Sequence, residues 1–251
     1  MQVVIIGTGN VATVLSKLII KKGYIITEIV GRVYDNALLI ADAIGVKANN
    51  TIALINRTAD IYIIAVSDDA IADVARQLQL GDKLVVHTAG SINKNVLANS
   101  SSNYGVLWPL QTLRKEMAEI PAVPFVIDAN NEAALNTLEI FGKSISPQCL
   151  RANENERMKL HLAAVTVSNF TNHLYVLAEN YCINEGLDFG LLLPLINETV
   201  QRIQHHLPKN VQTGPAIRGD TKTIETHLQL LRKYPFFQQV YQLLSNSIRD
   251  K

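Results

Sequence analysis

Two glycines and an alanine near the start of the chain, Gly7, Gly9 and Ala12, have the spacing G-x-G-x-x-A. Residues 3–6 before them are apolar and β-branched, and the residues after them have helical periodicity. In a strand, turn and helix of this kind, the glycines allow a tight turn and a close approach of backbone amides to a pyrophosphate. The N–H groups at the start of the helix would bind that anion. The expected dinucleotide-binding residues of this turn are Gly7, Thr8, Gly9, Asn10 and Val11.

The residues after the second expected strand indicate which dinucleotide binds. That strand covers residues 24–30 and is followed by Gly31 and Arg32. NAD sites usually place a carboxylate there, which accepts hydrogen bonds from the ribose hydroxyls. An arginine cannot accept these bonds, but it can bind a ribose 2′-phosphate with two N–H groups. There are two alternatives: Arg32 is a solvated surface residue, or the site binds NAD through Asp35. We expect NADP.

Two further strand ends carry polar residues. Ser67 follows the expected strand 60–66, and the expected strand 83–87 ends at His87. Because ligands bind beyond the carboxyl ends of parallel strands, we expect both ends to line the same crevice, with His87 near the nicotinamide. Helix capping also explains Ser67, and His87 could be a buried core residue. The further expected cofactor-binding residues are Val66, Ser67, Thr88, Ala89 and Gly90.

Strand-like and helical segments alternate through the first 150 residues. The expected strands are 3–6, 24–30, 60–66, 83–87, 104–108, 125–128 and 144–150, and the expected helices are 11–21, 36–44, 69–78 and 132–142. This alternation predicts an α/β fold, a Rossmann doubly wound parallel sheet, in an NADP-binding domain of residues 1–150. Helical periodicity then takes over, and it predicts an all-α C-terminal domain of residues 151–251 for substrate binding and dimerisation.

One long helix, residues 153–185, is expected to open the second domain and to reach about 50 Å. Placed at 100° intervals, its residues form two arcs. The apolar arc, expected to be core, contains Leu160, Ala163, Ala164, Val167, Phe170, Leu174 and Leu177. The polar arc contains Lys159, His161, Ser168, Asn169, Asn172 and His173. Amides, imidazoles and a hydroxyl are typical of a half-buried wall, either of a substrate cleft or of a dimer interface.

Composition excludes several classes of partner. The chain has 23 basic and 22 acidic residues, well mixed, so we expect neither nucleic acid nor a membrane surface as partner. Cys149 and Cys182 are far apart and have no ligand-like neighbours, so free thiols and no metal site are expected. The sequence has no apolar run of about 20 residues and no signal-peptide pattern, so we expect a cytoplasmic protein.

Several motifs together resemble a known family. They are GTGNVA at 7–12, Arg32, HTAGS at 87–91, WPLQT at 108–112, KLHLAAVTVSNF at 159–170 and QTGPAIRGD at 212–220. The chain resembles Rossmann-like candidate NADP oxidoreductases that carry a C-terminal helical domain of unknown function. These proteins are relatives of pyrroline-5-carboxylate reductase, 6-phosphogluconate-type dehydrogenases and deazaflavin-dependent NADP reductases. The resemblance spans nearly the whole chain.

The resemblance implies a homodimer through the C-terminal helices. It also implies that a polar stretch before a late helix, here Thr213, Gly214 and Pro215, closes over the substrate. Relatives often have histidine where this sequence has Trp108. If that histidine is catalytic in them, its role here is vacant or is taken by His87 or His161.

These observations lead to a first hypothesis: hydride transfer from NADPH to a small carbonyl or imine substrate. The expected catalytic residues are His161 or Lys159 as proton donor, together with Asn169 and His87. The expected substrate contacts are Thr213, Gly214 and His173. We also expect one cleft between the domains, lined by Gly9, Ser67, His87, His161 and Thr213. The alternatives are a non-catalytic NADP-binding or redox-sensing protein, and a deazaflavin-dependent NADP reductase.

Overall fold

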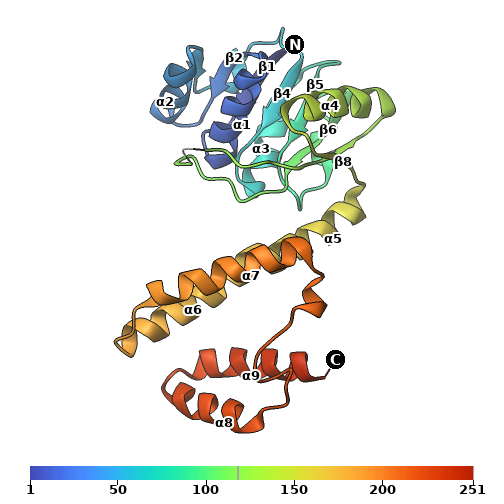
Figure 1. Cartoon of the computed structure of the whole chain (residues 1–251). Helices are drawn as coiled ribbons and strands as arrows, with labels where there is room; N and C mark the ends of the chain where they lie inside the picture. The colour runs from blue at the N-terminus through green and yellow to red at the C-terminus, as the bar shows by residue number, and fades with distance from the viewer. Residues whose placement is uncertain (118, 251) are drawn as a thin grey trace. The chain divides into compact units, whose positions relative to one another are not determined.

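The protein is described by a computed structural model covering residues 1–117 and 119–250. The chain divides into two compact units, Met1–Ser168 and Asn169–Lys251, which we call the Rossmann unit and the helical unit. Figure 1 shows the strands gathered in the Rossmann unit, whereas α7, α8 and α9 belong to the helical unit. Within the described residues, no helix is long and apolar enough to cross a membrane.

An eight-stranded sheet, in the order β3-β2-β1-β4-β5-β6-β7-β8, forms the centre of the Rossmann unit. The strands are β1 (Gln2–Ile6), β2 (Ile25–Val30), β3 (Lys47–Asn49), β4 (Ile61–Ile64), β5 (Leu84–His87), β6 (Asn103–Pro109), β7 (Phe125–Ala129) and β8 (Cys149–Arg151). Strands β1 to β6 are parallel to one another. β7 pairs antiparallel with β6 and parallel with β8. The predicted Rossmann-like α/β fold is confirmed, with two reversed strands at one edge.

Apolar clusters cover both faces of this sheet. Along β1, Val3 and Ile5 join one cluster while Val4 and Ile6 join the other, as the alternation of side chains along a strand requires. The first cluster packs under α1 (Asn10–Lys21), α2 (Tyr34–Ile44) and α4 (Glu132–Ile145). The second packs under α3 (Ile71–Gln77) and the short helices η1 (Ile52–Leu54) and η3 (Lys94–Leu97). Another short helix, η2 (Asp68–Ala70), directly precedes α3. Burial on both faces fixes the sheet and therefore the loops at its carboxyl edge.

The long helix expected at 153–185 is present as three consecutive segments, α5 (Glu154–Ala164), a π-helical segment η4 (Val165–Phe170) and α6 (Thr171–Asn184). Asn153 and Glu156 start it with a reciprocal capping box. Residues up to Ser168 belong to the Rossmann unit, because side chains of α5 contact the sheet and its loops. The units therefore differ from the expected ranges 1–150 and 151–251, whose roles in cofactor and substrate binding stay predictions.

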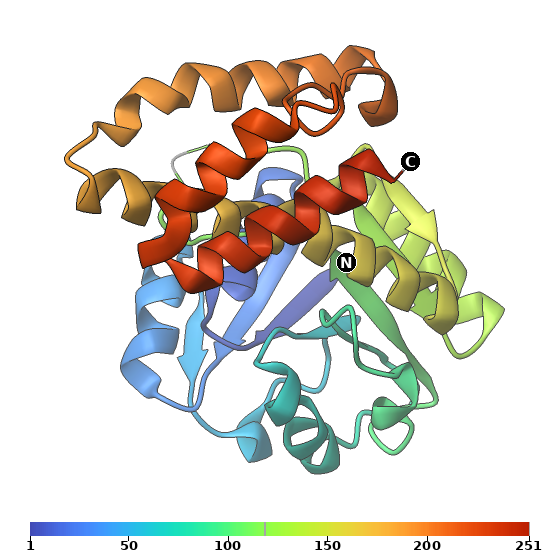
Figure 2. The same ribbon diagram turned by 90° about the horizontal axis from the view of Figure 1, so that it is seen from below.

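The helical unit continues with η5 (Phe189–Leu192), α7 (Leu193–His205), η6 (Pro208–Asn210), α8 (Thr221–Leu230), η7 (Leu231–Lys233) and α9 (Pro235–Arg249). Helices α8 and α9 lie side by side (Figure 2), and the His227 ring is hydrogen-bonded to the Tyr241 hydroxyl at 2.7 Å. Among residues 169–250, only Cys182, Ala216, Leu231 and Ser245 are buried.

The apolar arc of the long helix is not core within this chain, which corrects the expectation. Val167 is 73% exposed and Phe170 is 58% exposed. Only four of residues 169–250 are buried, so the helical unit has no core into which this arc could pack. The π-helical segment also rotates the residues after it relative to a regular 100° spacing.

Candidate active site

The first glycine of the turn after β1 is required by the protein's own backbone. Gly7 has φ +133°, a conformation that side chains rarely adopt, and a Cβ there would lie 2.1 Å from the carbonyl oxygen of Ala65. Its N–H donates to the carbonyl of Val30 at 2.8 Å. Gly7 thus packs the turn between the ends of β2 and β4.

The second glycine of the turn is not required by the fold. Gly9 has φ −84°, and a Cβ there would meet nothing within 4 Å. Gly9 is the N-cap of α1, and no side chain caps the helix, so the first amides of α1 lack the partner that a helix start normally needs. Open space in front of uncapped amides fits the pyrophosphate of a dinucleotide.

A cavity of about 690 Å³ opens in front of this turn. Of the sequence-predicted cofactor residues, it brings together Gly7, Thr8, Gly9, Asn10, Val11, Arg32, Val66 and Ser67. Arg32 is exposed at the end of β2. The cavity lies where the adenosine end and the pyrophosphate of a Rossmann-bound dinucleotide are expected.

Sequence reasoning missed part of the cavity wall. The missed lining residues are Val33, Asn36, Asn50, Thr51, Ile52, Asp73, Val74 and Gln77, among others. Asn50 and Thr51 follow β3, which was not expected because three residues of mixed polarity give no strand pattern. A carboxylate within the mostly apolar second strand, Glu28, was the available signal, because a buried charge needs partners.

Glu28 fixes the loop that carries three of these missed residues, Asn50, Thr51 and Ile52. It is only 6% exposed. Its carboxylate accepts hydrogen bonds from the Asn49 side chain at 3.1 Å and from the Asn56 amide at 3.0 Å. The Asn49 side chain in turn accepts from the Thr51 amide at 3.0 Å. This buried carboxylate therefore fixes the loop after β3, which forms one wall of the cavity.

Three predicted cofactor residues do not line the cavity. Thr88, Ala89 and Gly90 follow β5 and are buried. The Thr88 hydroxyl donates to the carbonyl of Ile64 at 3.5 Å, and the Ser91 hydroxyl donates to Asp68 at 2.7 Å. The loop after β5 is therefore joined to the end of β4, and its role toward the nicotinamide stays a prediction.

His87, a predicted catalytic residue, is completely buried at the end of β5. Its Nδ1 accepts a hydrogen bond from the Ala89 amide at 3.2 Å, and its Nε2 has no partner among the described residues. Burial, and then the charge of Arg157, lowers the pKa of His87 to about 4. A neutral imidazole without solvent contact favours the core alternative for His87 over the catalytic one.

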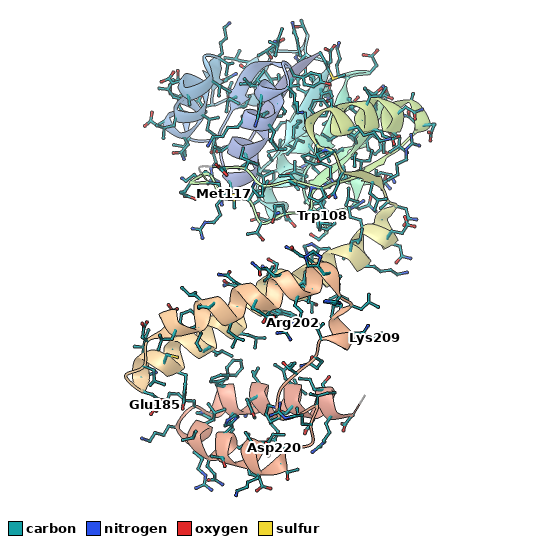
Figure 3. The ribbon with its side chains drawn as sticks, viewed as in Figure 1. Trp108, Met117, Glu185, Arg202, Lys209 and Asp220 are labelled. Atoms are coloured by element: carbon teal, nitrogen blue, oxygen red, sulfur yellow. The ribbon has the colours of Figure 1, made fainter. Side chains whose placement is uncertain are left out.

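At the end of β6, Trp108 lies between the loop after β5 and the long helix. A Cβ on Gly90 would lie 2.6 Å from the Trp108 indole, so that ring packs directly on the glycine. The imidazole of His161 stands edge-on to the same indole, with ring centroids 5.5 Å apart and an interplanar angle of 65°. Figure 3 shows Trp108 at the edge of the Rossmann unit. The structure thus brings together HTAGS, WPLQT and the first turns of the long helix.

A second contact joins the same motif to the long helix. The hydroxyls of Thr112 and Ser168 are 3.1 Å apart. His161 is half-buried, whereas Lys159 is exposed. Two residues correspond to about 200° around a helix, so Lys159 lies on the opposite side of α5 from His161. This corrects the expectation that both residues share the polar arc.

The loop after β6 passes beside the glycine-rich turn. The Lys115 amide donates to the Asn10 side chain at 3.1 Å, and the buried Leu113 joins the cluster that also contains Ala12. Figure 1 shows this green loop crossing near α1, and Met117 marks it in Figure 3. The start of α1 is therefore held by a loop distant in sequence.

The predicted residues of the helical unit lie in two regions. The ring of His173 on α6 is 6.1 Å from that of Phe236 on α9. Thr213 and Gly214 lie in the irregular segment before α8, where Gly214 has φ +106°. Asp220 caps α8 by accepting from the Thr223 amide at 3.1 Å, and hydrogen bonds from Thr223 lower the pKa of Asp220. The expected cleft between the domains, and a substrate role for Asn169, stay predictions.

No group of three or more histidine, cysteine, aspartate or glutamate side chains within residues 1–117 and 119–250 could hold a metal ion. Cys149 and Cys182 are free thiols.

The fold and cavity define a dinucleotide-binding Rossmann protein with a helical C-terminal region, and known proteins agree. Residues 2–91 match the family described as NADP oxidoreductase, coenzyme F420-dependent. Residues 123–248 match a domain of unknown function, DUF2520. A candidate NADP oxidoreductase from Bacteroides fragilis is 36% identical, with a TM-score of 0.90 over 100% of this chain and 98% of that one. The chain belongs to this family of NADP oxidoreductases with a C-terminal DUF2520 domain.

Two less similar structures have the same fold. A protein from Thermotoga maritima is 24% identical, with a TM-score of 0.76 over 99% of this chain and 97% of that chain. An imine reductase from Myxococcus stipitatus, solved with NADP⁺, is 14% identical, with a TM-score of 0.65 over 100% of this chain and 93% of that chain. No curated protein sequence matches the chain. The expected family is confirmed, and with it NADP as the cofactor of the family.

Proposed function

We propose that this protein is an NADPH-dependent reductase of a small imine or carbonyl compound. The single observation that carries the proposal is the packing of Trp108 between Gly90 and the edge-on imidazole of His161. β6 carries Trp108 and lies three strands from β1 in the order β1-β4-β5-β6, about 14 Å across the sheet at the usual strand spacing. A dinucleotide whose pyrophosphate binds after β1 would extend its nicotinamide in this direction.

NADPH supplies a hydride when it is bound. Reduction of an imine or carbonyl also consumes a proton, which a protein side chain must deliver. His161 is the residue we assign to this step, because its half-buried imidazole lies at the carboxyl edge of the sheet against Trp108. Lys159 is the weaker candidate, because it is exposed on the opposite side of α5.

The surroundings of His161 suit a small, partly apolar substrate. The Trp108 indole is only 7% exposed and gives the site an apolar wall. The paired hydroxyls of Thr112 and Ser168 supply polar groups about two helical turns further along the long helix. An imine or carbonyl carbon needs an apolar, water-poor setting for reduction together with a single proton donor. Asn169, Thr213, Gly214 and His173 stay the predicted further substrate contacts.

The imine reductase from Myxococcus stipitatus shares the fold, and imine reduction is one of the two reactions proposed here. The test is a panel of keto acids, imino acids and cyclic imines, watched for oxidation of NADPH. We expect turnover with at least one member, a fall in kcat of roughly 100-fold in His161→Gln, and little change in the matched variant Lys159→Gln. If kcat instead falls in Lys159→Gln and not in His161→Gln, Lys159 is the proton donor.

Electron exchange between NADP and a deazaflavin is the second candidate, favoured by the description of the family that residues 2–91 match. It predicts NADPH oxidation only when a deazaflavin is added. A third candidate, a non-catalytic NADP-binding or redox-sensing protein, predicts tight NADP binding without oxidation under either condition.

A further inference from the structure

Arg157, on the first turns of α5, is a buried charge that no step above uses. Its side chain is completely buried. Nε donates to the Gly90 carbonyl at 3.0 Å, and Nη2 donates to the Ile92 carbonyl at 2.8 Å. Nη1 donates to Asp128 at 3.3 Å. One guanidinium therefore joins the loop after β5, strand β7 and helix α5.

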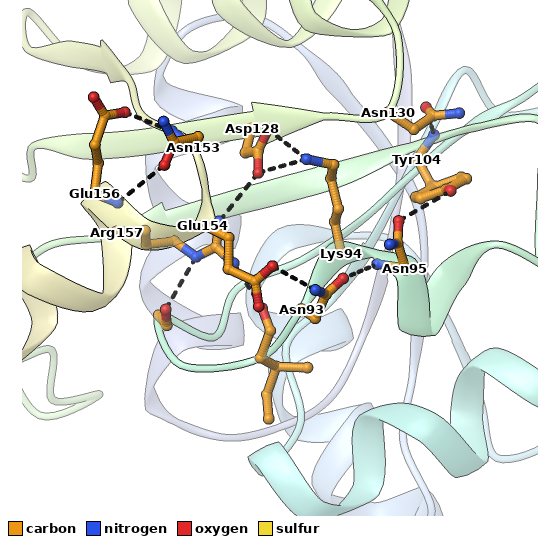
Figure 4. A network of polar contacts seen from close by, with 12 residues as sticks. Asn93, Lys94, Asn95, Tyr104, Asp128, Asn130, Asn153, Glu154, Glu156 and Arg157 are labelled. Atoms are coloured by element: carbon orange, nitrogen blue, oxygen red, sulfur yellow. Dashed lines mark hydrogen bonds and ion pairs between the residues drawn. The ribbon is translucent and has the colours of Figure 1, made fainter.

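The charge of Arg157 is balanced by a carboxylate that a second cation shares. Asp128, on β7, accepts two hydrogen bonds from the Lys94 ammonium, at 2.9 and 2.8 Å. Figure 4 shows the carboxylate between the two cations, with Lys94 rising from η3. Burying charged groups is costly unless they are paired, so a network of this kind needs a reason beyond packing.

A second tie joins the same loop to the same helix. The Asn93 side chain donates to Glu154, in the first turn of α5, and accepts from the Asn95 amide at 2.7 Å. Figure 4 shows both ties side by side. Because Asn153 and Glu156 fix the start of α5, the helix cannot rotate or slide without breaking its bonds to the loop.

The position of Arg157 on the helix decides what those bonds control. His161 is four residues later, about one turn along α5, so it lies on the same side of the helix as Arg157. His161 contacts Trp108, and Ser168 contacts Thr112. Trp108 in turn packs on Gly90, whose carbonyl Arg157 binds. Arg157 therefore closes a ring of contacts from Gly90 through Trp108 and His161 back to itself.

We propose that Arg157 is a positioning residue: its three hydrogen bonds fix the loop after β5 against α5, and so fix the His161 imidazole relative to the nicotinamide end of the cofactor. The assignment rests on the proposed reductase function. A planar guanidinium can donate hydrogen bonds to two carbonyls and a carboxylate at once, whereas a lysine donates from a single nitrogen and cannot reach all three acceptors. A conservative substitution of Arg157 by lysine can therefore separate the effect of geometry from the effect of charge.

The test compares Arg157→Lys with Lys94→Met. Arg157→Lys keeps the charge beside Asp128 and loses the two-carbonyl contact, whereas Lys94→Met removes a cation from the same carboxylate and leaves that contact intact. We expect Arg157→Lys to keep NADP affinity within about threefold, because Arg157 does not line the cofactor cavity, and to lower kcat by roughly 10- to 100-fold. We expect Lys94→Met to lower Tm and to leave kcat within about threefold of wild type. Wild-type kcat in a folded Arg157→Lys protein would overturn the proposal.

Trp108 is the only tryptophan of the chain, so its emission reports the ring of contacts without turnover. We expect the emission to shift in Arg157→Lys and not in Lys94→Met. If the wild type reduces no substrate, the proposed function fails, and the emission alone then decides the positioning role.

A variant at the surface covers the case in which Arg157→Lys does not fold. Glu154→Ala removes the exposed tie to Asn93 and cannot open the core. We expect an unchanged Tm, a change in Trp108 emission and a fall in kcat of a few-fold. Unchanged emission together with unchanged kcat in this variant would contradict the proposal.

Discussion

The carbonyl oxygen of Ala65 would be 2.1 Å from a Cβ at Gly7, whereas a Cβ at Gly9, two residues later, would meet nothing within 4 Å. One glycine of the motif is thus required by the fold. The other, Gly9, faces open space that no other described residue of the protein fills.

Alanine substitutions should separate these two roles. Gly7→Ala is expected to lower the free energy of unfolding by roughly 3 kcal/mol or more, from backbone strain and overlap. Gly9→Ala is expected to leave Tm unchanged and to weaken NADP binding more than tenfold, because the methyl group takes the place of the pyrophosphate. Thermal unfolding and cofactor titration measure the two effects. A Gly9→Ala protein that binds NADP normally would place the pyrophosphate elsewhere.

Arg32, the second residue after β2, is expected to select NADP over NAD. Arg32 lines the cofactor cavity and is exposed, so its guanidinium is available to a ribose 2′-phosphate. Arg32→Asp should abolish or reverse the preference, a change of roughly 10- to 100-fold in relative affinity. Arg57→Asp is the matched control, because Arg57 is exposed and does not line the cavity. Equal affinity of the wild type for NAD and NADP would refute this assignment.

Stability should decrease in acid through His87. The pKa of His87 is lowered to about 4 by burial and by Arg157, while an unfolded chain has the ordinary histidine value near 6.5. The unfolded state therefore binds the proton first. The stabilisation is fully present above about pH 6.5 and is lost as the pH falls toward 4, by roughly 3 kcal/mol. Urea unfolding of wild type and His87→Gln across this range measures the difference. Parallel curves for the two proteins would show that His87 titrates normally.

The apolar surface of the helical unit predicts a homodimer. Among residues 169–250 only four are buried, while large apolar side chains such as Phe170, Leu191 and Leu243 are 58%, 77% and 70% exposed. A second copy covering these helices would bury a surface that is otherwise unusually apolar for a monomer. Light scattering at micromolar concentration should give twice the 27.7 kDa of one chain. A mass of one chain would rule the dimer out.

The elements were largely predictable, because strong local patterns specify them. Buried parallel strands such as 61–64 are continuous apolar runs, and the long helix has a capping residue, Asn153, at its start. β3 was missed because its three residues are polar or small, and its pairing with β2 is a tertiary contact. The reversal of β7 was also beyond reach, because strand direction depends on the path of the loop before it.

The candidate site was predictable only where a backbone motif marks it. Gly7, Gly9 and Arg32 were found because a turn and a strand end require particular residues. Arg157 was missed, because an arginine in a charged helical turn looks solvated until the fold buries it. His87 was assigned to the site from its strand end alone, yet the alternation of side chains along β5 places it on the same face as Val85, which the second apolar cluster covers.

The proposal of hydride transfer from NADPH at the Trp108–His161 edge is tested most directly with deuterium. The protein would be incubated with the panel of keto acids, imino acids and cyclic imines and with NADPH that carries deuterium at the transferred position of the nicotinamide. The masses of the products would be measured by mass spectrometry. We predict a product heavier by one deuterium from the labelled cofactor, at a rate that falls roughly 100-fold in His161→Gln. Tight binding of NADPH with no labelled product from any member of the panel, with or without a deazaflavin, would contradict the account and favour the non-catalytic alternative.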